Sequence, residues 1–377
     1  MNKVNVIIKA TNACNLRCAY CYNSDTEYCN AILPIKKFEK FMILLAQKYN
    51  EIDIIWHGGE PLLVGLDYMT QAMDAEARIR FDRGVKITNK IQTNGTLIDK
   101  KWAEFFKKHD IKPGLSFDGL NNEKYRQGTD KVLRAMELLK KEGVRFGTLA
   151  VVADNDYDYL ANYKFFVEKK ISTDFSPIFK EGNAKDLSDL EAEKFADEMI
   201  RLFDYWITDK TGVGIRLFTN YMSMTMGKNC RTCTNASCIG NFFSIYPNGD
   251  IFNCGRSSMT NYPFGNIDSV ESVEDLFRSQ GFHDLLVGAI SRREKCKEAC
   301  DLFEYCCGSC SDGAIIEGGL DKIPTFSCYC FKKIFKHVYD ATLKLIEDKT
   351  DLDTLNPAAK RTLIDCFTIE DDVKKEK

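Results

Sequence analysis

The sequence of 377 residues lacks the features that would place it in a membrane or on the secretory route. It contains no run of 18 apolar residues, which is about the length that a membrane-spanning helix needs. Its N-terminus, MNKVNVIIKATNAC, has neither the apolar core nor the small-residue cleavage site of a signal peptide. We therefore expect a cytoplasmic protein that does not bind membranes.

The sequence also lacks an excess of charge of one sign. It has 52 basic and 55 acidic residues, so the net charge is −3 and no global positive field attracts nucleic acid. Apolar residues make up 44% and charged residues 28%, which excludes wholesale disorder. At roughly 150 residues per domain, the length predicts two or three domains, although an α/β barrel can exceed 200 residues as one unit.

Cysteine is the residue that the sequence has in excess. Sixteen cysteines are present, and disulfides rarely persist in the expected compartment. Clustered cysteines in such a protein are typical of metal sites.

The first 180 residues alternate short apolar runs with longer amphipathic segments. The predicted strands cover residues 4–9, 52–57, 86–92, 114–117, 144–152 and 173–178. The predicted helices cover residues 34–49, 67–80, 99–109, 130–142 and 159–169. This alternation predicts an α/β fold with a parallel sheet covered by helices, either open or curled toward a barrel.

Conspicuous residues follow the first four predicted strands. They are the first cysteines, Gly58-Gly59-Glu60-Pro61, Thr93-Asn94-Gly95 and Asp118-Gly119. Because ligands of parallel α/β folds bind at the carboxyl ends of the strands, we expect these residues to share one face.

The second half changes in composition. A helix is predicted over residues 187–210, with Ser188 as its N-cap, and an amphipathic helix over 331–347. Residues 230–330 hold eleven of the sixteen cysteines and show little helical period, which predicts a small domain organised by metal rather than by an apolar core. The tail at 371–377 is expected to fray. The predicted units are therefore residues 1–185, 186–229, 230–345 and 346–377.

The first cysteine group is Cys14, Cys18 and Cys21, spaced CxxxCxxC directly after the first strand. Three thiolates can hold three irons of a four-iron cluster and leave the fourth iron open, which is typical of a catalytic site. A zinc site is the alternative interpretation.

This spacing, with Tyr20 before the third cysteine and the GGEP segment, resembles the radical S-adenosylmethionine (SAM) superfamily. The resemblance implies a partial (β/α)6 barrel whose 4Fe–4S cluster binds SAM and cleaves it reductively to a 5′-deoxyadenosyl radical. The residues that would contact SAM by this resemblance are Tyr20, Gly58, Gly59, Glu60, Ser116, Arg126 and Val151. Glu60 would pair with the SAM ammonium and Arg126 would bind its carboxylate. For Arg126 a solvated helix charge, and for Ser116 a strand-end cap, remain open as alternatives.

The later cysteines resemble the SPASM domain, which carries two auxiliary 4Fe–4S clusters. The spacing matches except that three residues separate Cys296 and Cys300 where two are usual. The resemblance assigns one auxiliary cluster to Cys233, Cys238, Cys254 and Cys310. It assigns the other to Cys296, Cys300, Cys306 and Cys328.

Several of these assignments have a competing cysteine. Cys230 competes with Cys233, Cys307 with Cys306, and Cys330 with Cys328, while Cys29 and Cys366 are expected bystanders. A pair of zinc ribbons is the alternative for the whole segment. The segment 245–254 is predicted to form a hairpin that precedes a ligand.

The resemblance spans residues 4–339 and includes anaerobic sulfatase-maturating enzymes and maturases of ribosomally made peptides. Sulfatase maturases place an aspartate base directly after the cysteine equivalent to Cys254, whereas this chain has Gly255 and Arg256. Neither residue can act as a base. The first hypothesis is therefore a peptide maturase that forms a thioether or carbon–carbon cross-link, and the alternative is oxidation of Cys or Ser to formylglycine.

The resemblance also implies partners. They are a peptide or protein substrate and an external electron donor such as flavodoxin or ferredoxin. Because the first strand begins at residue 4, we expect leader recognition to use a separate protein, the SPASM surface, or nothing. A non-catalytic electron-transfer protein is less favoured, because the SAM loop and GGEP are intact. An activase of a partner enzyme is less favoured, because radical transfer rarely needs both auxiliary clusters.

Overall fold

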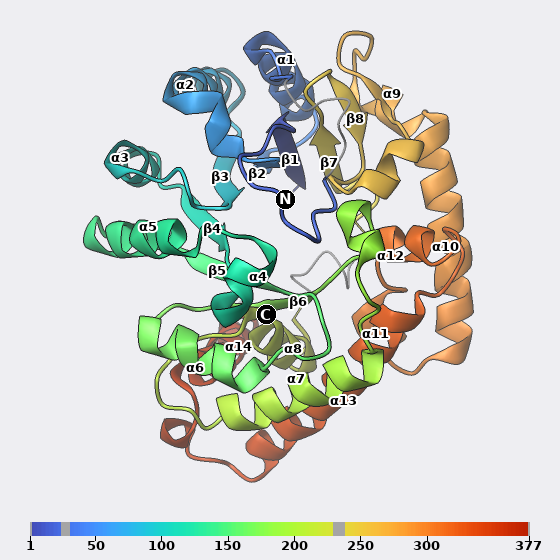
Figure 1. Ribbon diagram of the computed structural model, residues 1–377. Helices are drawn as coiled ribbons and strands as arrows, with labels where there is room; N and C mark the ends of the chain where they lie inside the picture. Colours follow the sequence, from blue (N-terminus) through green and yellow to red (C-terminus); the bar gives the residue numbers. More distant parts are fainter. Residues whose placement is uncertain (1, 24–30, 229–237, 376–377) are drawn as a thin grey trace.

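The computed structural model describes residues 2–23, 31–228 and 238–375, and for residues 257 and 368–375 it describes the backbone only. In these residues the strands form one sheet in the order β6-β5-β4-β3-β2-β1-β7-β8-β9 (Figure 1). The helices surround this sheet. The architecture is the predicted α/β fold.

The first six strands are parallel and lie in sequence order across the sheet. They are β1 (Lys3–Thr11), β2 (Glu51–Gly58), β3 (Lys86–Thr93), β4 (Lys112–Ser116), β5 (Gly147–Val152) and β6 (Phe175–Pro177). Each overlaps a strand that the sequence predicts. The β/α alternation is therefore confirmed.

Helices cover the outer side of these strands, where Figure 1 shows them as an arc. They are α1 (Ile35–Ala46), α2 (Gly65–Arg83), α3 (Lys100–Lys108), α5 (Thr129–Lys141) and α6 (Tyr159–Lys169), with the short α4 (Asn122–Tyr125) between β4 and α5. Side-chain N-caps determine where two of these helices begin. The Asp99 carboxylate accepts the Trp102 N–H at 2.9 Å at the start of α3, and Asp158 caps α6 in the same way.

The core of this half lies between the strands and the helices. Ile52, Ile54 and Trp56 of β2 are completely buried, as are Phe38 and Phe41 of α1. Side chains of a strand alternate between the two faces, so the other face of each strand lines the inner side of the sheet.

The sheet continues into the cysteine-rich half. Strand β7 (Phe242–Ile245) pairs in parallel with β1, with Asn5 opposite Phe242, and β8 (Asp250–Phe252) and β9 (Gly265–Asn266) follow antiparallel. The predicted hairpin at 245–254 is confirmed. The proposed boundaries at 185 and 229 stay predictions, and one continuous sheet spans them.

An apolar core also extends under this hairpin, which corrects part of the sequence-based expectation. Phe243, Ile251, Ile267 and Leu276 are buried and belong to the same apolar cluster as the barrel core. Metal was expected to organise all of 230–330. That expectation is wrong for the hairpin, because its alternating residues pack on the extended sheet.

Helices α7 (Ala192–Trp206), α8 (Arg216–Thr225), α13 (Thr325–Glu347) and α14 (Pro357–Lys375) pack together below the barrel strands. Two of the predicted boundaries are wrong. Glu191, not Ser188, is the N-cap of α7, because Asn155 holds the preceding backbone extended through bonds to Glu191 N–H and the Asp189 carbonyl. The helix α14 runs to Lys375, although a frayed tail was predicted from 371, because Ala359, Leu363 and Cys366 anchor it at helical spacing.

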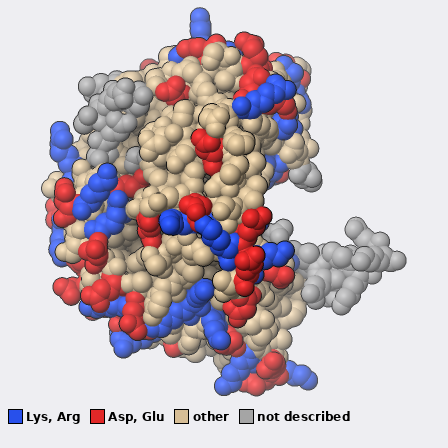
Figure 2. Space-filling model, turned by 90° about the vertical axis from the view of Figure 1, so that its right-hand side faces the viewer, with Lys and Arg blue, Asp and Glu red and all other residues tan. Residues whose placement is uncertain are grey.

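Residues 273–316 form helices that the sequence did not predict: α9 (Val273–Phe277), α10 (Gln280–Ala299), α11 (Phe303–Cys306) and α12 (Ser311–Ile316). The buried positions of α10 are Gly281, Leu285, Ala289 and Arg292. Their spacing is helical, but two are small and one is charged, so they show little apolar period. On its outer side, Leu286, Val287 and Ile290 are exposed, and this side of the molecule has a broad area without charged side chains (Figure 2).

Candidate active site

The first three candidate cysteines lie on the loop that follows β1. Cys18 is buried, Cys21 is partly buried and Cys14 is exposed. The Cys21 N–H donates to the Cys18 carbonyl at 3.2 Å, which folds this end of the loop into a turn. Burial raises the pKa of all three thiols. Because iron binds thiolates, cluster assembly there must release protons.

The three thiols supply the number and kind of ligands that a four-iron cluster with one open iron needs. Among the residues that the structure describes, no three Cys, His, Asp or Glu side chains are grouped as ligands of one metal ion. A four-iron cluster has a different requirement, because each iron takes a separate thiolate. Cys14, Cys18 and Cys21 satisfy that requirement by supplying three soft sulfur ligands from one short loop.

Asp118 organises the predicted SAM contacts, although the sequence singled it out only as a residue after a strand. Its carboxylate is completely buried. It accepts hydrogen bonds from the Tyr20 hydroxyl, from Arg126 Nε at 3.2 Å and from the Val151 N–H at 2.9 Å. Three of the predicted residues therefore converge on one carboxylate. Their direct contact with SAM stays a prediction.

Arg126 links this group to the cysteine loop. Its Nη1 lies 3.8 Å from Cys18 Sγ, and its guanidinium lies 5.2 Å from the centroid of the Tyr20 ring. Its side chain is only 13% exposed. It is therefore not the solvated helix charge that the sequence left open.

The Gly58–Gly59–Glu60 loop packs tightly against the chain after β1. A Cβ on Gly58, whose φ is +120°, would lie 2.2 Å from the Thr11 carbonyl oxygen, and one on Gly59 would lie 2.1 Å from that of Ala13. These glycines therefore allow the loop to approach the backbone that leads into the cysteine loop. Contact with SAM by the same glycines stays a prediction.

Glu60 fixes this loop from inside the protein. Its carboxylate is completely buried and accepts the Leu62 N–H at 3.0 Å, the Thr93 hydroxyl at 2.6 Å and the Asn94 N–H at 2.8 Å. Burial raises its pKa to about 7. This arrangement favours a positioning role for the side chain. The predicted contact with the SAM ammonium is then expected from the backbone of the loop.

Ser116 ends β4 on the inner side of the sheet. Its hydroxyl accepts a hydrogen bond from Gln92 Nε2 at 2.8 Å. The neighbouring strand β5 places Val151 two residues beyond Leu149, which is opposite Ser116. Ser116 and Val151 therefore lie near the carboxyl ends of adjacent strands, as the sequence predicts for SAM contacts.

The position of the missing aspartate faces β1. A Cβ on Gly255 would lie 3.2 Å from Ile7 Cγ2 and 3.4 Å from Lys9 Cε. Lys9 is almost completely buried, and its ammonium donates to Asn23 Oδ1 at 2.7 Å and to the Tyr246 hydroxyl at 2.9 Å. An apolar side chain, Ile7, and a cationic one, Lys9, therefore lie nearest to this position.

A second cation, Arg256, lies beside it. The guanidinium is held between two rings, 4.4 Å from the centroid of Tyr22 and 3.7 Å from that of Phe179, and its Nε is 3.8 Å from Asp312 Oδ2. Burial, followed by the charges of Lys9 and Arg256, lowers the pKa of His57 to about 4. Two cationic side chains, Lys9 and Arg256, thus lie near residue 255, with Asp312 beside the second.

The structure brings together the four cysteines assigned to one auxiliary cluster. Cys328, in the first turn of α13, lies close enough to Cys296, Cys300 and Cys306 to interact electrostatically with each of them. Burial is the main cause that raises the pKa of Cys306, to about 12. The ligand set stays a prediction, and the arrangement agrees with it.

The described cysteines of the other set also lie near one another. Cys254 and Cys310 both interact electrostatically with Arg256, and Cys238 and Cys310 both interact with Arg292. Cys233 lies outside the described residues, as do Cys230 and Cys29.

Two of the competing cysteines occupy less suitable places. Cys330 is buried in the apolar core and donates from Sγ to the Ala192 carbonyl at 3.5 Å, on the side of α13 that faces α7. Cys307 has a positive φ of 55°, and its Sγ lies 3.6 Å from the Glu304 carbonyl. The structure therefore favours Cys328 over Cys330 and Cys306 over Cys307. Cys366 lies buried on α14, away from these groups.

Arg292 is a residue of this region that the sequence did not reveal. It is 2% exposed, and it donates from Nε to the Gly308 carbonyl at 2.8 Å, from Nη2 to Ser311 Oγ at 2.9 Å and from Nη1 to the Leu320 carbonyl. A buried guanidinium thus ties together the loops that carry Cys306 and Cys310. An arginine on a charged helix gives no sequence signal for such a role.

Known proteins resemble this chain over nearly its full length. Residues 8–166 match the Radical SAM superfamily. The serine-type anaerobic sulfatase-maturating enzyme of Bacteroides thetaiotaomicron is 30% identical over 375 residues, which cover 88% of this chain and 89% of that protein. The cysteine-type enzyme of Clostridium perfringens is 29% identical over 364 residues, which cover 90% of this chain and 97% of that protein.

A solved structure is similar as well. Native anSMEcpe with bound AdoMet and Cp18Cys peptide superimposes with a TM-score of 0.79 and 26% identity, over 92% of this chain and 99% of that one. Within the described residues, no helix is long and apolar enough to cross a membrane. The chain belongs to the radical SAM superfamily and, within it, to the family of anaerobic sulfatase-maturating enzymes, and it uses a 4Fe–4S cluster and SAM.

Proposed function

We propose that this enzyme oxidises a cysteine of a peptide or protein substrate to formylglycine. The observation that carries the proposal is the extent of the likeness: two sulfatase-maturating enzymes align over 97% and 89% of their own lengths. The shared part thus includes the cysteine-rich half as well as the barrel. The similar structure with a bound peptide supports a peptide substrate.

This proposal reverses the order of the two hypotheses drawn from the sequence analysis. A cross-linking maturase came first because Gly255 replaces the expected base. The relatives instead favour formylglycine formation. Gly255 then has to be explained within that reaction.

The residues of this chain have separable roles in the proposal. Cys14, Cys18 and Cys21 would hold the cluster that binds SAM, and the two auxiliary cysteine sets would hold two further clusters. When bound, these groups would supply the means to remove one hydrogen atom and one electron from the substrate cysteine, whose thiol also loses a proton. The resulting thioaldehyde takes up water and releases hydrogen sulfide, which leaves the aldehyde. An external donor such as flavodoxin or ferredoxin supplies the reducing electron.

The protein side chains position these groups. Asp118 orients the Arg126 guanidinium, which is suited to bind a carboxylate. Glu60 fixes the glycine loop beside the cysteine loop. Both carboxylates are completely buried, so they act by holding other groups in place.

The two cations near Gly255 support a reaction without the usual base, and they predict the substrate side chain. A cysteine thiol has a pKa of about 8.5, and nearby Lys or Arg side chains stabilise its thiolate. Lys9 and Arg256 supply such charges near the position where the base is missing. A serine hydroxyl is far less acidic, so the same charges do not ionise it. We therefore propose cysteine rather than serine as the target.

Matched peptides test both parts of this proposal. A sulfatase-type peptide with Cys and the same peptide with Ser are incubated with the anaerobically reconstituted enzyme, SAM and a reductant. We expect an aldehyde, located by fragmentation mass spectrometry, in the Cys peptide only. Equal conversion of the Ser peptide would contradict the choice of cysteine, and a cross-link without aldehyde would restore the first hypothesis.

A variant separates the effect of charge from that of fold. Arg256→Gln should shift the pH dependence of conversion to higher pH, because the substrate thiolate loses a stabilising cation, while uncoupled SAM cleavage continues. Arg278→Gln removes an exposed arginine from another part of the surface and serves as the matched control.

A further inference from the structure

A pocket of about 420 Å³ lies on the inner side of the sheet, away from the cysteine loop. Its lining includes Lys112, the first residue of β4, and Gly147, the first residue of β5. The predicted SAM contacts Ser116 and Val151 lie toward the other ends of these strands. The pocket therefore opens toward the amino ends of β4 and β5, and its lining contains none of the predicted SAM contacts.

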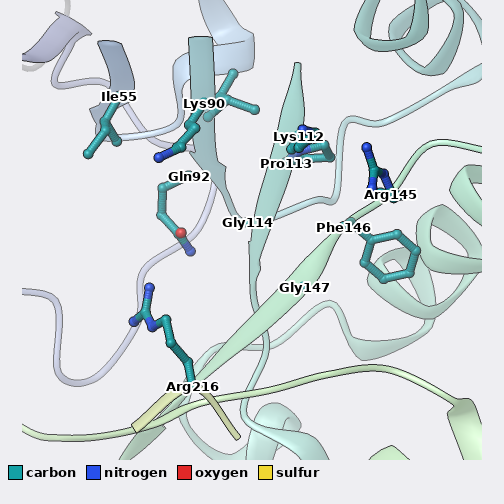
Figure 3. Close-up of a pocket in the computed structure, with 11 residues that line it drawn as sticks. Ile55, Lys90, Gln92, Lys112, Pro113, Gly114, Arg145, Phe146, Gly147 and Arg216 are labelled. Atoms are coloured by element: carbon teal, nitrogen blue, oxygen red, sulfur yellow. The ribbon is translucent and has the colours of Figure 1, made fainter. Parts of the chain in front are cut away.

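The charge of this pocket has one sign. Four cationic side chains line it, and they come from four elements: Lys90 of β3, Lys112 of β4, Arg145 before β5 and Arg216 at the start of α8 (Figure 3). The lining contains no Asp or Glu. These like charges repel one another, and a bound anion would offset the repulsion.

The carboxylates around the pocket compensate only part of this charge. Arg216 is paired with Asp174 at 2.8 Å, and Lys90 is 3.9 Å from Asp53. Neither Lys112 nor Arg145 forms an ion pair with any residue in the described ranges 2–23, 31–228 and 238–375. Two cations thus remain available to an anionic ligand.

The floor of the pocket is suited to close approach. Gly114 and Gly147 are opposite each other on β4 and β5, so both strands lack side chains at this point. Ile55 and Phe146 supply apolar walls, and Gln92 supplies an amide (Figure 3). A pocket of this size with apolar walls and a few polar groups fits a small organic molecule.

We propose that this pocket binds a small organic anion that carries two or more phosphate or carboxylate groups, and that this binding is coupled to SAM binding. Arginine and lysine recognise these oxyanion groups through charge-assisted hydrogen bonds. The coupling runs through Gln92, which lines the pocket and also donates to Ser116, a predicted SAM contact, at 2.8 Å. An anion that takes the Gln92 amide changes the hydrogen bond to Ser116.

Titration calorimetry on the reconstituted full-length enzyme tests the site with pyrophosphate and citrate as probes. We expect both to bind, and the double variant Lys112→Gln/Arg145→Gln to weaken binding at least tenfold. The control Lys100→Gln/Lys101→Gln removes the same charge from the exposed start of α3 and should leave binding unchanged. No binding, or equal binding to both double variants, would overturn the site.

Two further measurements address the source of the anion and the coupling. An Asp- and Glu-rich peptide is titrated in parallel, and binding of this peptide without binding of the free anions would reject a small-molecule ligand. Saturating pyrophosphate should change the Kd of SAM in the unmodified enzyme but not in Lys112→Gln/Arg145→Gln, since coupled sites affect each other reciprocally. An unchanged Kd in the unmodified enzyme would reject the coupling.

Discussion

The barrel half and the segment from α10 to the start of α13 are stabilised in different ways. In the barrel, whole strand faces such as Ile52, Ile54 and Trp56 are completely buried. The segment from residue 280 to 328 buries a few small or polar residues, among them Ala289, Arg292 and Asp312, around partly exposed cysteines. Apolar burial is sufficient to hold the first region, whereas we expect the second to depend on metal ligation and on polar contacts.

The backbone of the second region supports this difference. Three consecutive residues, Cys307, Gly308 and Ser309, have positive φ values of 55°, 87° and 62°. For residues other than glycine this conformation costs roughly 1–2 kcal/mol each. The loop between Cys306 and Cys310 is therefore unfavourable by itself, and we expect cluster ligation to compensate for it.

The largest effect should come from the first cysteine loop, and it should be confined to function. Replacing Cys14, Cys18 and Cys21 together by Ala should lower the iron content from about twelve to about eight atoms and abolish SAM cleavage. The apolar core of the barrel is not built from these cysteines, so its circular dichroism and melting should change little. Zinc with negligible iron, after strictly anaerobic purification, would contradict the cluster assignment.

The next largest effect should separate the two regions directly. Cys254→Ala or Cys310→Ala removes a proposed ligand, and hydrogen exchange should then increase in residues 280–328 while β1–β5 stay protected. Cys366→Ala removes a buried thiol of α14 and is the matched control. Unchanged exchange in residues 280–328 would mean that this segment folds without its clusters.

A buried acid in the barrel provides a test that does not depend on metal. Burial raises the pKa of Glu76 to about 7, while Asn89 Nδ2 donates to its carboxylate at 2.6 Å. The folded state therefore holds a proton that the unfolded state loses near pH 4.5, so this group destabilises the fold as the pH rises from about 4.5 to 7. Glu60, whose pKa is also raised to about 7, likewise lowers the free energy of unfolding as the pH rises. His57 has a pKa lowered to about 4, so it instead raises the free energy of unfolding as the pH rises from about 4 to 6.5.

The variant Glu76→Gln cannot ionise, so its stability should lack the contribution of Glu76 to the pH dependence. Each pKa unit corresponds to about 1.4 kcal/mol. The difference in free energy of unfolding, variant minus unmodified protein, should therefore increase by about 3 kcal/mol between pH 4.5 and 7. Denaturant unfolding in buffers of constant ionic strength measures the difference. Glu104→Gln, on the exposed side of α3, is the matched control.

The smallest effect is expected where the two halves meet at the surface. Lys37 of α1 pairs with Asp268, beyond β9, at 2.6 Å, and the Asp268 side chain is 64% exposed. Exposed pairs of this kind contribute less than about 1 kcal/mol. Asp268→Asn should therefore change the unfolding midpoint only slightly. A larger loss would show that charge contributes substantially to holding the halves together.

The sequence predicted the parts of the molecule that local patterns encode. The six barrel strands follow from their apolar runs, and the grouping of Cys296, Cys300, Cys306 and Cys328 follows from the resemblance to the SPASM domain. The pairing of β7 with β1 could not be predicted, because it joins distant short segments and has no local signal. Arg292 was missed for a related reason: only tertiary burial distinguishes it from the exposed charges of its helix.

The pairing of β1 with both β2 and β7 also has a consequence for biosynthesis. During synthesis β2 is available early, but β7 emerges only after most of the barrel half has been made. Until then β1 is an edge strand with unpaired backbone groups, which is a template for association with other chains. Because closing such a long loop is slow, this edge stays open until the hairpin of β7 and β8 packs against it. The rate at which this hairpin docks should therefore decide how much of the newly made chain aggregates before it becomes an enzyme.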